Sequence, residues 1–91
     1  MSIDRDSPDL LFEQVADLLR RQIASGELPP RRKLATQEEL ADQLQVSRGT
    51  VLRATKVLTD EGLLRFVPGR GLFTADAPAI ERFKRSRAKK R

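Results

Sequence analysis

Apolar residues between positions 8 and 25 recur at three- and four-residue intervals, the spacing of a helix with one buried face. The pattern predicts a helix over about residues 10–25. Pro8 lies near its start and Gly26 just past its end, as helix termini favour, and Pro29 and Pro30 prevent its continuation. The residues expected on the buried face are Phe12, Val15, Ala16, Leu19 and Ile23.

Two shorter helical patterns follow, separated by a very short turn. Thr36 and Glu39 have the spacing of a capping box, which predicts a helix over about residues 36–44. Ser47 is a second N-cap and predicts a helix over about residues 47–61. The residues expected to face inward are Leu40, Ala41, Leu44, Val51, Ala54 and Leu58. Two short helices joined so tightly are typical of a helix-turn-helix unit.

Residues 63–75 have the pattern of a β-hairpin. The segments 63–67 and 72–75 are apolar enough to be strands, and they flank a turn, 68–71, that contains Gly69 and Gly71. A two-stranded hairpin is marginally stable alone, so we expect it to pack on the helices. The predicted fold class is therefore mainly α with a small β-hairpin, a three-helix winged helix-turn-helix. It would occupy residues 10–75, with the wing at about 63–75, an N-terminal arm at 1–9 and a basic C-terminal tail at 76–91.

Length and composition exclude several classes of function. A chain of 91 residues forms one small core that is too small to enclose a substrate cavity, so function is expected on an outer surface. The absence of cysteine and histidine removes disulfides, thiolate nucleophiles, the usual zinc ligands and the commonest general base. We expect no enzyme, no cofactor and no metal site. No apolar run approaches the ~20 residues that span a bilayer, which predicts a cytoplasmic protein without a membrane partner.

The positive charge is concentrated at the C-terminus. The net charge is +5, yet residues 79–91 hold seven Lys and Arg against Glu81 alone. Such a segment is either a solvated terminus or an arm that contacts phosphates. Residues 76–78 are also able to start a short helix with Ile80 and Phe83 on one side. We expect Arg82 to Arg91 to form a flexible arm that adds non-specific phosphate contacts.

The outward face of the helix at 47–61 is the candidate DNA-reading surface, because the N-terminal turn of such a helix enters the major groove. The outward residues are Arg48, Gly49, Leu52, Arg53 and Lys56, with Thr50 near the rim. Arginines can pair bidentately with guanine, and threonine can bond a base or a phosphate. Leu52 would either contact a thymine methyl or be a tolerated exposed residue. The alternative is that these cations only solvate an exposed helix face.

From residue 11 to residue 75 the sequence resembles the DNA-binding domain of the GntR family of bacterial transcription regulators. The matching segments, in order, are residues 11–16, 23–30, 39–41, 46–48, 50–51, 62–63 and 69–73. Each segment is weak alone, but their joint order and spacing are specific. The resemblance implies a homodimer that binds an inverted-repeat operator in double-stranded DNA, with the helix at 47–61 in the major groove and the wing in the minor groove.

Repression of transcription is the function that the resemblance implies. The alternative is an accessory or architectural DNA-binding protein of a plasmid, phage or mobile element. Either protein would be associated with the nucleoid. A third possibility is a winged helix that contacts protein or RNA. The candidate DNA-binding residues are Lys33, Thr36, Gln37, Ser47, Arg48, Gly49, Thr50, Leu52, Arg53, Lys56, Gly69, Arg70 and Gly71.

The chain departs from the family pattern at four places. Glu38 replaces an arginine, so no DNA contact is transferred to it. Leu52 replaces the frequent arginine of the recognition helix, which is displaced to Arg53. Gln45 stands where the turn usually has glycine, which costs about 1 kcal/mol if the residue is left-handed. The chain also ends 16 residues after Ala75. It would be either a free-standing small regulator without a small-molecule effector site or a segment of a longer one.

Overall fold

The computed structural model describes residues 10–89, so the predicted arm at 1–9 and the last two residues of the tail lie outside the described residues. The elements, in order, are α1 (Leu11–Ser25), α2 (Gln37–Leu44), α3 (Arg48–Asp60), β1 (Leu64–Val67), β2 (Gly71–Thr74) and α4 (Ala77–Lys89). The strands form one antiparallel hairpin. The mainly α fold class with a small hairpin is confirmed. Within this range no helix is long and apolar enough to cross a membrane.

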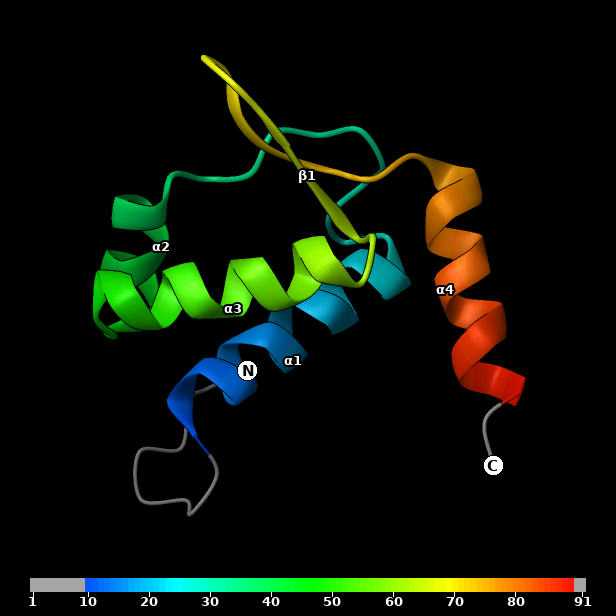
Figure 1. The fold of residues 1–91 in the computed structure, drawn as a ribbon. Helices are drawn as coiled ribbons and strands as arrows, with labels where there is room; N and C mark the ends of the chain where they lie inside the picture. Colours follow the sequence, from blue (N-terminus) through cyan, green and yellow to red (C-terminus); the bar gives the residue numbers. More distant parts are fainter. Residues whose placement is uncertain (1–9, 90–91) are drawn as a thin grey trace.

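Helix α3 packs against α1 and α2, and α4 packs against α1. In Figure 1, α1 runs beneath α3, α2 stands at one end of α3, and α4 stands apart on the side of the other end. The hairpin starts at the C-terminal end of α3, and its tip extends back over the helix toward α2. The face of α3 that is turned away from α1, beneath the tip of the hairpin, is left open.

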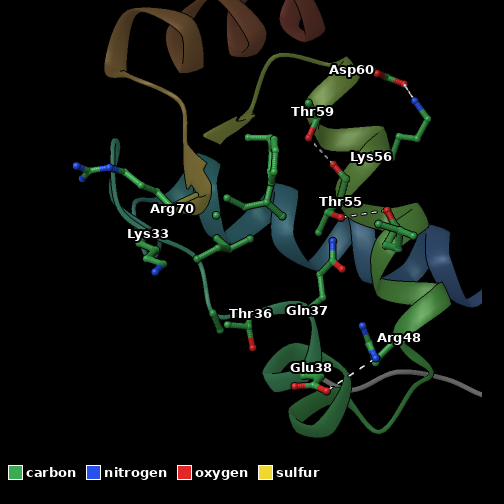
Figure 2. Close-up of a pocket in the computed structure, with 16 residues that line it drawn as sticks. Lys33, Thr36, Gln37, Glu38, Arg48, Thr55, Lys56, Thr59, Asp60 and Arg70 are labelled. Atoms are coloured by element: carbon green, nitrogen blue, oxygen red, sulfur yellow. Dashed lines mark hydrogen bonds and ion pairs between the residues drawn. The ribbon is translucent and has the colours of Figure 1, made fainter. Parts of the chain in front are cut away.

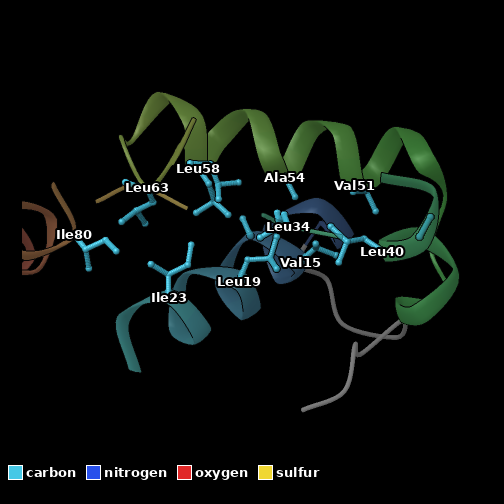
Figure 3. Packing of buried hydrophobic residues seen from close by; sticks show 14 residues of the cluster. Val15, Leu19, Ile23, Leu34, Leu40, Val51, Ala54, Leu58, Leu63 and Ile80 are labelled. Atoms are coloured by element: carbon cyan, nitrogen blue, oxygen red, sulfur yellow. The ribbon is translucent and has the colours of Figure 1, made fainter. Parts of the chain in front are cut away.

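The core is formed where α1 and α3 cross (Figure 3). Val51, Ala54 and Leu58 of α3 have no exposed surface, because their spacing places them on one face directed at α1. Most of the predicted face of α1 is buried, but Phe12 in its first turn is only partly buried, and Leu18 is buried as well. The other buried apolar residues of the cluster are Leu34, Leu40, Ala41, Leu63, Leu64, Ala75 and Ile80.

Side-chain caps fix both helices of the helix-turn-helix. The Thr36 hydroxyl accepts a hydrogen bond from the Glu39 amide at 3.0 Å, and the Glu39 carboxylate accepts one from the Thr36 amide at 2.9 Å. At the start of α3, the Ser47 hydroxyl accepts from the Thr50 amide at 3.0 Å. Between the helices Gln45 adopts a left-handed conformation, with φ 59° and ψ 44°. The turn is tight because a non-glycine residue takes this unfavourable geometry.

An ion pair joins α1 to the end of α3. The Arg20 guanidinium donates to both carboxylate oxygens of Glu61, at 3.0 and 2.8 Å, and also to Asp17 at 2.6 Å. The side chains of Arg20 and Glu61 are 16% and 26% exposed. The hydrogen bonds to Glu61 raise the pKa of Arg20, against the opposing effect of burial.

The hairpin is held to the helices by the segment before α2. The register pairs Leu64 with Thr74 and Val67 with Gly71. The Thr74 hydroxyl is buried, where it donates to the Pro29 carbonyl at 2.6 Å and accepts from the Arg32 amide at 2.8 Å. Lys33 forms an isolated bridge to Phe73. Residues 29–34 therefore lie along β2 and fix the direction of the wing.

The structure has helix α4 where a flexible arm was expected, because the chain is helical as far as Lys89. The Asp76 carboxylate caps the helix by accepting from the Ala79 amide at 3.0 Å, and Pro78 occupies the first turn, where no amide is needed. Ile80 is buried in the core. The prediction of a flexible arm was wrong for residues 82–89, and the alternative of a helix that starts at residues 76–78 is the one the structure shows.

Candidate nucleic-acid interface

A groove of about 700 Å³ lies between the open face of α3, the start of α2 and the wing. We call it the α3–wing groove. Figure 2 shows Lys33 and Arg70 on its wing side, Arg48 and Lys56 on α3, and Gln37 directed into its middle from the start of α2. The residues that line the groove are Lys33, Leu34, Ala35, Thr36, Gln37, Glu38, Arg48, Leu52, Thr55, Lys56, Thr59, Asp60, Phe66, Arg70, Gly71 and Leu72.

Two exposed apolar side chains line this groove from different elements. Leu52 of α3 is 53% exposed and Phe66 of β1 is 64% exposed. Among the described residues only Leu10 is a comparably exposed large apolar side chain, and it lies outside the groove. Phe66 points here because the register puts it on the same strand face as Leu72. The groove therefore offers an apolar strip with polar borders, which suits the thymine methyl groups and sugars of a nucleic acid.

Cations outnumber carboxylates around the strip. Arg48 lies 3.8 Å from Glu38, and Lys56 lies 3.7 Å from Asp60. No ion pair is found for Lys33 or for Arg70 within residues 10–86. The groove carries a net charge of +2, from four cations and two carboxylates. Such a surface attracts a polyanion, and its exposed ion pairs are weak enough to be exchanged for other partners.

The first turn of α3 is open to a ligand. Ser47 and Gly49 are exposed and Thr50 is half-buried. A side chain built on Gly49 would come near nothing but the Ser47 hydroxyl, at 3.8 Å, so the chain's own packing does not require glycine here. The Ser47 and Thr50 hydroxyls lie 2.9 Å apart. The bare backbone at Gly49 leaves room for close approach of a partner.

The structure brings eight of the thirteen predicted residues into the α3–wing groove. They are Lys33, Thr36, Gln37, Arg48, Leu52, Lys56, Arg70 and Gly71. Ser47, Gly49 and Thr50 lie at the start of α3 beside it, and Gly69 lies in the wing turn, where the Arg70 amide donates to the Val67 carbonyl at 2.9 Å. Gly69 has a φ of 79°, which this turn requires.

Arg53 is placed differently from the expectation. Its guanidinium lies 4.3 Å from the centre of the Phe12 ring on α1, a cation–π contact. Arg53 does not line the groove. The residue follows Leu52 by one position, and the turn of about 100° per residue carries it around α3 toward α1. Phe12, only partly buried, supplies the ring that attracts it.

Sequence reasoning missed several residues of the groove. Phe66 was predicted only as a strand residue. The available signal was its spacing of two positions from Leu64, which places both side chains on one face of the strand. Thr55 and Thr59 line the groove although their hydroxyls donate to α3 carbonyls, at 3.0 and 2.8 Å. Glu38, to which no contact was transferred, lines it as well. Within the described residues, acidic side chains do not gather into a group of three that could hold a metal ion.

Comparisons with known proteins agree with this geometry. The model of a family described as "Bacterial regulatory proteins, gntR family" matches residues 11–74. The HTH-type transcriptional repressor NagR of Bacillus subtilis is 40% identical over 75 residues, which cover 82% of this chain and 31% of NagR. A histidine utilization repressor of Pseudomonas aeruginosa is 39% identical over 69 residues, covering 76% of this chain and 28% of the repressor. The chain thus spans less than a third of the length of these relatives.

Two solved structures share the fold. A GntR family transcriptional regulator from Listeria monocytogenes aligns with a TM-score of 0.84 and 27% identity, covering 92% of this chain and 75% of that one. AraR(DBD) in complex with operator ORR3 aligns with a TM-score of 0.68 and 37% identity, covering 76% of this chain and 86% of that one. The second of these neighbours was solved on its operator.

Proposed function

Since this chain belongs to the GntR family of bacterial regulatory proteins, we propose that it binds a specific operator in double-stranded DNA and represses transcription there. The observation that carries the proposal is the α3–wing groove, in which cations from α3, the wing and the segment before α2 border an apolar strip. The named relatives are transcriptional repressors rather than enzymes. This function places the protein on the bacterial chromosome, in the cytoplasm.

The start of α3 is the proposed base-reading element. A recognition helix presents its N-terminal residues to base edges in the major groove. Arg48 is the residue suited to guanine, because its guanidinium can donate to O6 and N7 together. Gly49 lets the backbone approach, Ser47 and Thr50 offer hydroxyls, and Leu52 contacts a thymine methyl. Arg53 is left out of the proposed interface because it lies over Phe12.

The remaining groove residues are proposed to hold the sugar–phosphate backbone. Lys33 and Lys56 supply charge from opposite walls, and the N-terminus of α2, with Thr36 and Gln37, supplies amides and polar side chains. The wing tip, residues 69–71, would enter the adjacent minor groove. These contacts set the register of α3 without reading sequence.

A homodimer on an inverted repeat completes the proposal. One chain carries one α3 and reads one half-site, so two copies related by a two-fold axis read two half-sites about one helical turn apart.

Selection of bound duplexes from a random pool at moderate salt tests the function directly. We expect a short inverted repeat to be enriched, and no enrichment would overturn the proposal. Footprints on the chromosome of the source bacterium then separate the alternatives. Sites that overlap promoters support repression, whereas sites at an attachment site or replication origin support an accessory DNA-binding protein.

A further inference from the structure

We propose that the outer face of the wing is a second phosphate-binding surface, formed by Arg31, Arg65 and Arg70. It would take the sugar–phosphate backbone on the far side of the minor groove that the wing enters. The inference rests on the proposed function and adds Arg31 and Arg65, which the sequence did not predict, to the predicted Arg70. We call the three residues the outer-wing arginines.

The strand register separates this surface from the α3–wing groove. Arg65 pairs with Phe73, so both lie on the strand face opposite to that of Phe66 and Leu72. A second hollow of about 280 Å³ lies on that side, lined by Arg31, Arg65, Val67, Arg70, Phe73 and Thr74. Arg70 lines both hollows, because it sits at the turn between the strands.

In the described part of the chain, no carboxylate lines the hollow of the outer-wing arginines or pairs with them. No acidic residue lines their hollow, and all three are exposed. Arg20 and Arg48 each form an ion pair, whereas no ion pair is found for the outer-wing arginines within residues 10–86. Three like charges around one hollow repel one another, and an anion between them removes that repulsion. The hollow therefore fits a phosphate group, which guanidinium groups bind well.

Arg31 is held in this position against its backbone preference. Its φ is 58°, a left-handed conformation that is uncommon for a residue with a side chain. Its amide donates to the Ala75 carbonyl at 3.1 Å, and the neighbouring Arg32 amide is bonded to the buried Thr74 hydroxyl. Residues in such conformations cluster at functional sites. Here the strained position holds an arginine from before α2 alongside the end of β2, at the hollow that Arg65 of β1 also lines.

The geometry of DNA explains why a wing needs cations on both faces. A minor groove is bounded by two sugar–phosphate backbones and is only about 6 Å wide, so a wing tip within it has one backbone on each side. The α3–wing groove, with Lys33, faces the backbone between the major and minor grooves. The outer-wing arginines face the other backbone. Arg70, at the tip, is within reach of both.

The salt dependence of binding tests this assignment. We compare wild type, R31G, R65A and the R31G/R65A double variant by fluorescence anisotropy on the selected duplex between about 50 and 200 mM salt. Each lost phosphate contact lowers the slope of log K against log salt by about 0.9. We expect the double variant to lose about 1.8 from the slope and at least tenfold in affinity at low salt, with unchanged base preference. R21A, an exposed arginine on α1, is the matched control and should keep the slope.

R31G also separates binding from folding, because glycine accepts a φ of 58° without strain. Its melting temperature should equal or exceed that of wild type while its DNA binding weakens. A merely structural Arg31 would give no loss of binding.

Neutral methylphosphonates locate the contact on the DNA. Replacing phosphates on the far side of the minor groove should weaken the wild type and leave the double variant almost unchanged. An unchanged slope and affinity in the double variant would overturn the inference and point to a protein partner for this face, while the selected operator would still support the proposed function. If selection enriches no sequence, the proposed function fails, and the salt slopes on random duplex still decide whether the outer-wing arginines bind phosphate.

Discussion

The Arg48 guanidinium, which we propose reads a base, lies 3.8 Å from the Glu38 carboxylate at the edge of the α3–wing groove. Both side chains are largely exposed, at 69% and 76%. In the free protein this pair screens a carboxylate that would otherwise repel phosphate. On DNA, Arg48 must leave Glu38 to pair with a base edge, so Glu38 competes with the operator.

E38Q is therefore expected to tighten DNA binding. An exposed ion pair contributes about 0.2–1 kcal/mol, so removing the competing carboxylate should raise affinity by a factor of about 1.4 to 5. Anisotropy titrations of the variant on the selected operator measure the change. E27Q is the matched control, because Glu27 is an exposed carboxylate outside the groove, and it should bind like wild type. Weaker binding by E38Q would show that Glu38 itself accepts a hydrogen bond from DNA.

Leu52 is expected to read a thymine methyl. Burial of one methyl contributes about 0.8 kcal/mol, so replacing the contacted thymine by uracil should weaken the wild type about fourfold. L52A should bind the thymine duplex about as weakly as wild type binds the uracil duplex. Its affinity should not fall further when thymine is replaced by uracil. L10A is the control, since Leu10 is equally exposed and lies outside the groove. A uracil effect of the same size in L52A and wild type would contradict the contact.

The bond between Arg20 and Glu61 predicts a stability effect without a binding effect. R20A leaves Glu61 partly buried and unpaired, which should lower the free energy of unfolding by about 1–2 kcal/mol and the melting temperature by roughly 4–8 °C per kcal/mol. R20K keeps the positive charge but cannot form the bidentate hydrogen bond to Glu61. It should therefore recover only part of the lost unfolding free energy. A melting temperature equal to wild type would contradict this account.

The pH dependence of this pair follows from the raised pKa of Arg20. A group whose pKa is higher in the folded state stabilises below its unfolded pKa and loses that contribution as pH rises through the folded value. The folded-state and unfolded-state pKa values of Arg20 both lie well above neutral pH. We therefore expect the stability difference between wild type and R20A to stay constant between about pH 6 and pH 9, measured by urea unfolding.

Thr74 ties wing position to DNA binding. T74V removes a hydroxyl that bonds the Pro29 carbonyl and the Arg32 amide, and it leaves both groups, whose bonds to Thr74 are partly buried, without that partner. We expect a loss of about 2 kcal/mol in unfolding free energy and weaker operator binding at temperatures where the variant is folded. T74S keeps the hydroxyl and should retain binding. A T74V protein with full affinity would show that the wing does not depend on this anchor.

The local features of the fold were predictable because their causes are local. The caps at Thr36 and Ser47 depend on residues three positions apart, and the inward face of α3 follows from helical periodicity alone. The family pattern, which usually has glycine in this turn, raised a left-handed conformation for Gln45 as a condition, and the structure shows it. The same local reasoning placed Arg48 and Leu52 on the open face.

The features that were not predicted from the sequence depend on contacts between residues far apart in the chain. Arg31 lines the same hollow as Arg65 because Thr74, more than 40 residues along the chain, holds the segment that contains Arg31. Arg53 turns to a ring on another helix, and α4 is ordered by Ile80 entering a core built by distant segments. The positions of Arg31 and Arg53 leave no periodic signal. The spacing of Ile80 and Phe83 did allow a helix, but it could not show that Ile80 enters the core.

The most direct test of the central claim is the base preference of R48A. Affinities are measured for wild type and R48A on every single-base-pair variant of the selected operator. We predict that R48A loses about 1–3 kcal/mol of discrimination at one guanine in each half-site and keeps the preferences at the other positions. A uniform loss over all variants would show that Arg48 contacts only phosphate, and an unchanged pattern would show that α3 does not read the operator through Arg48.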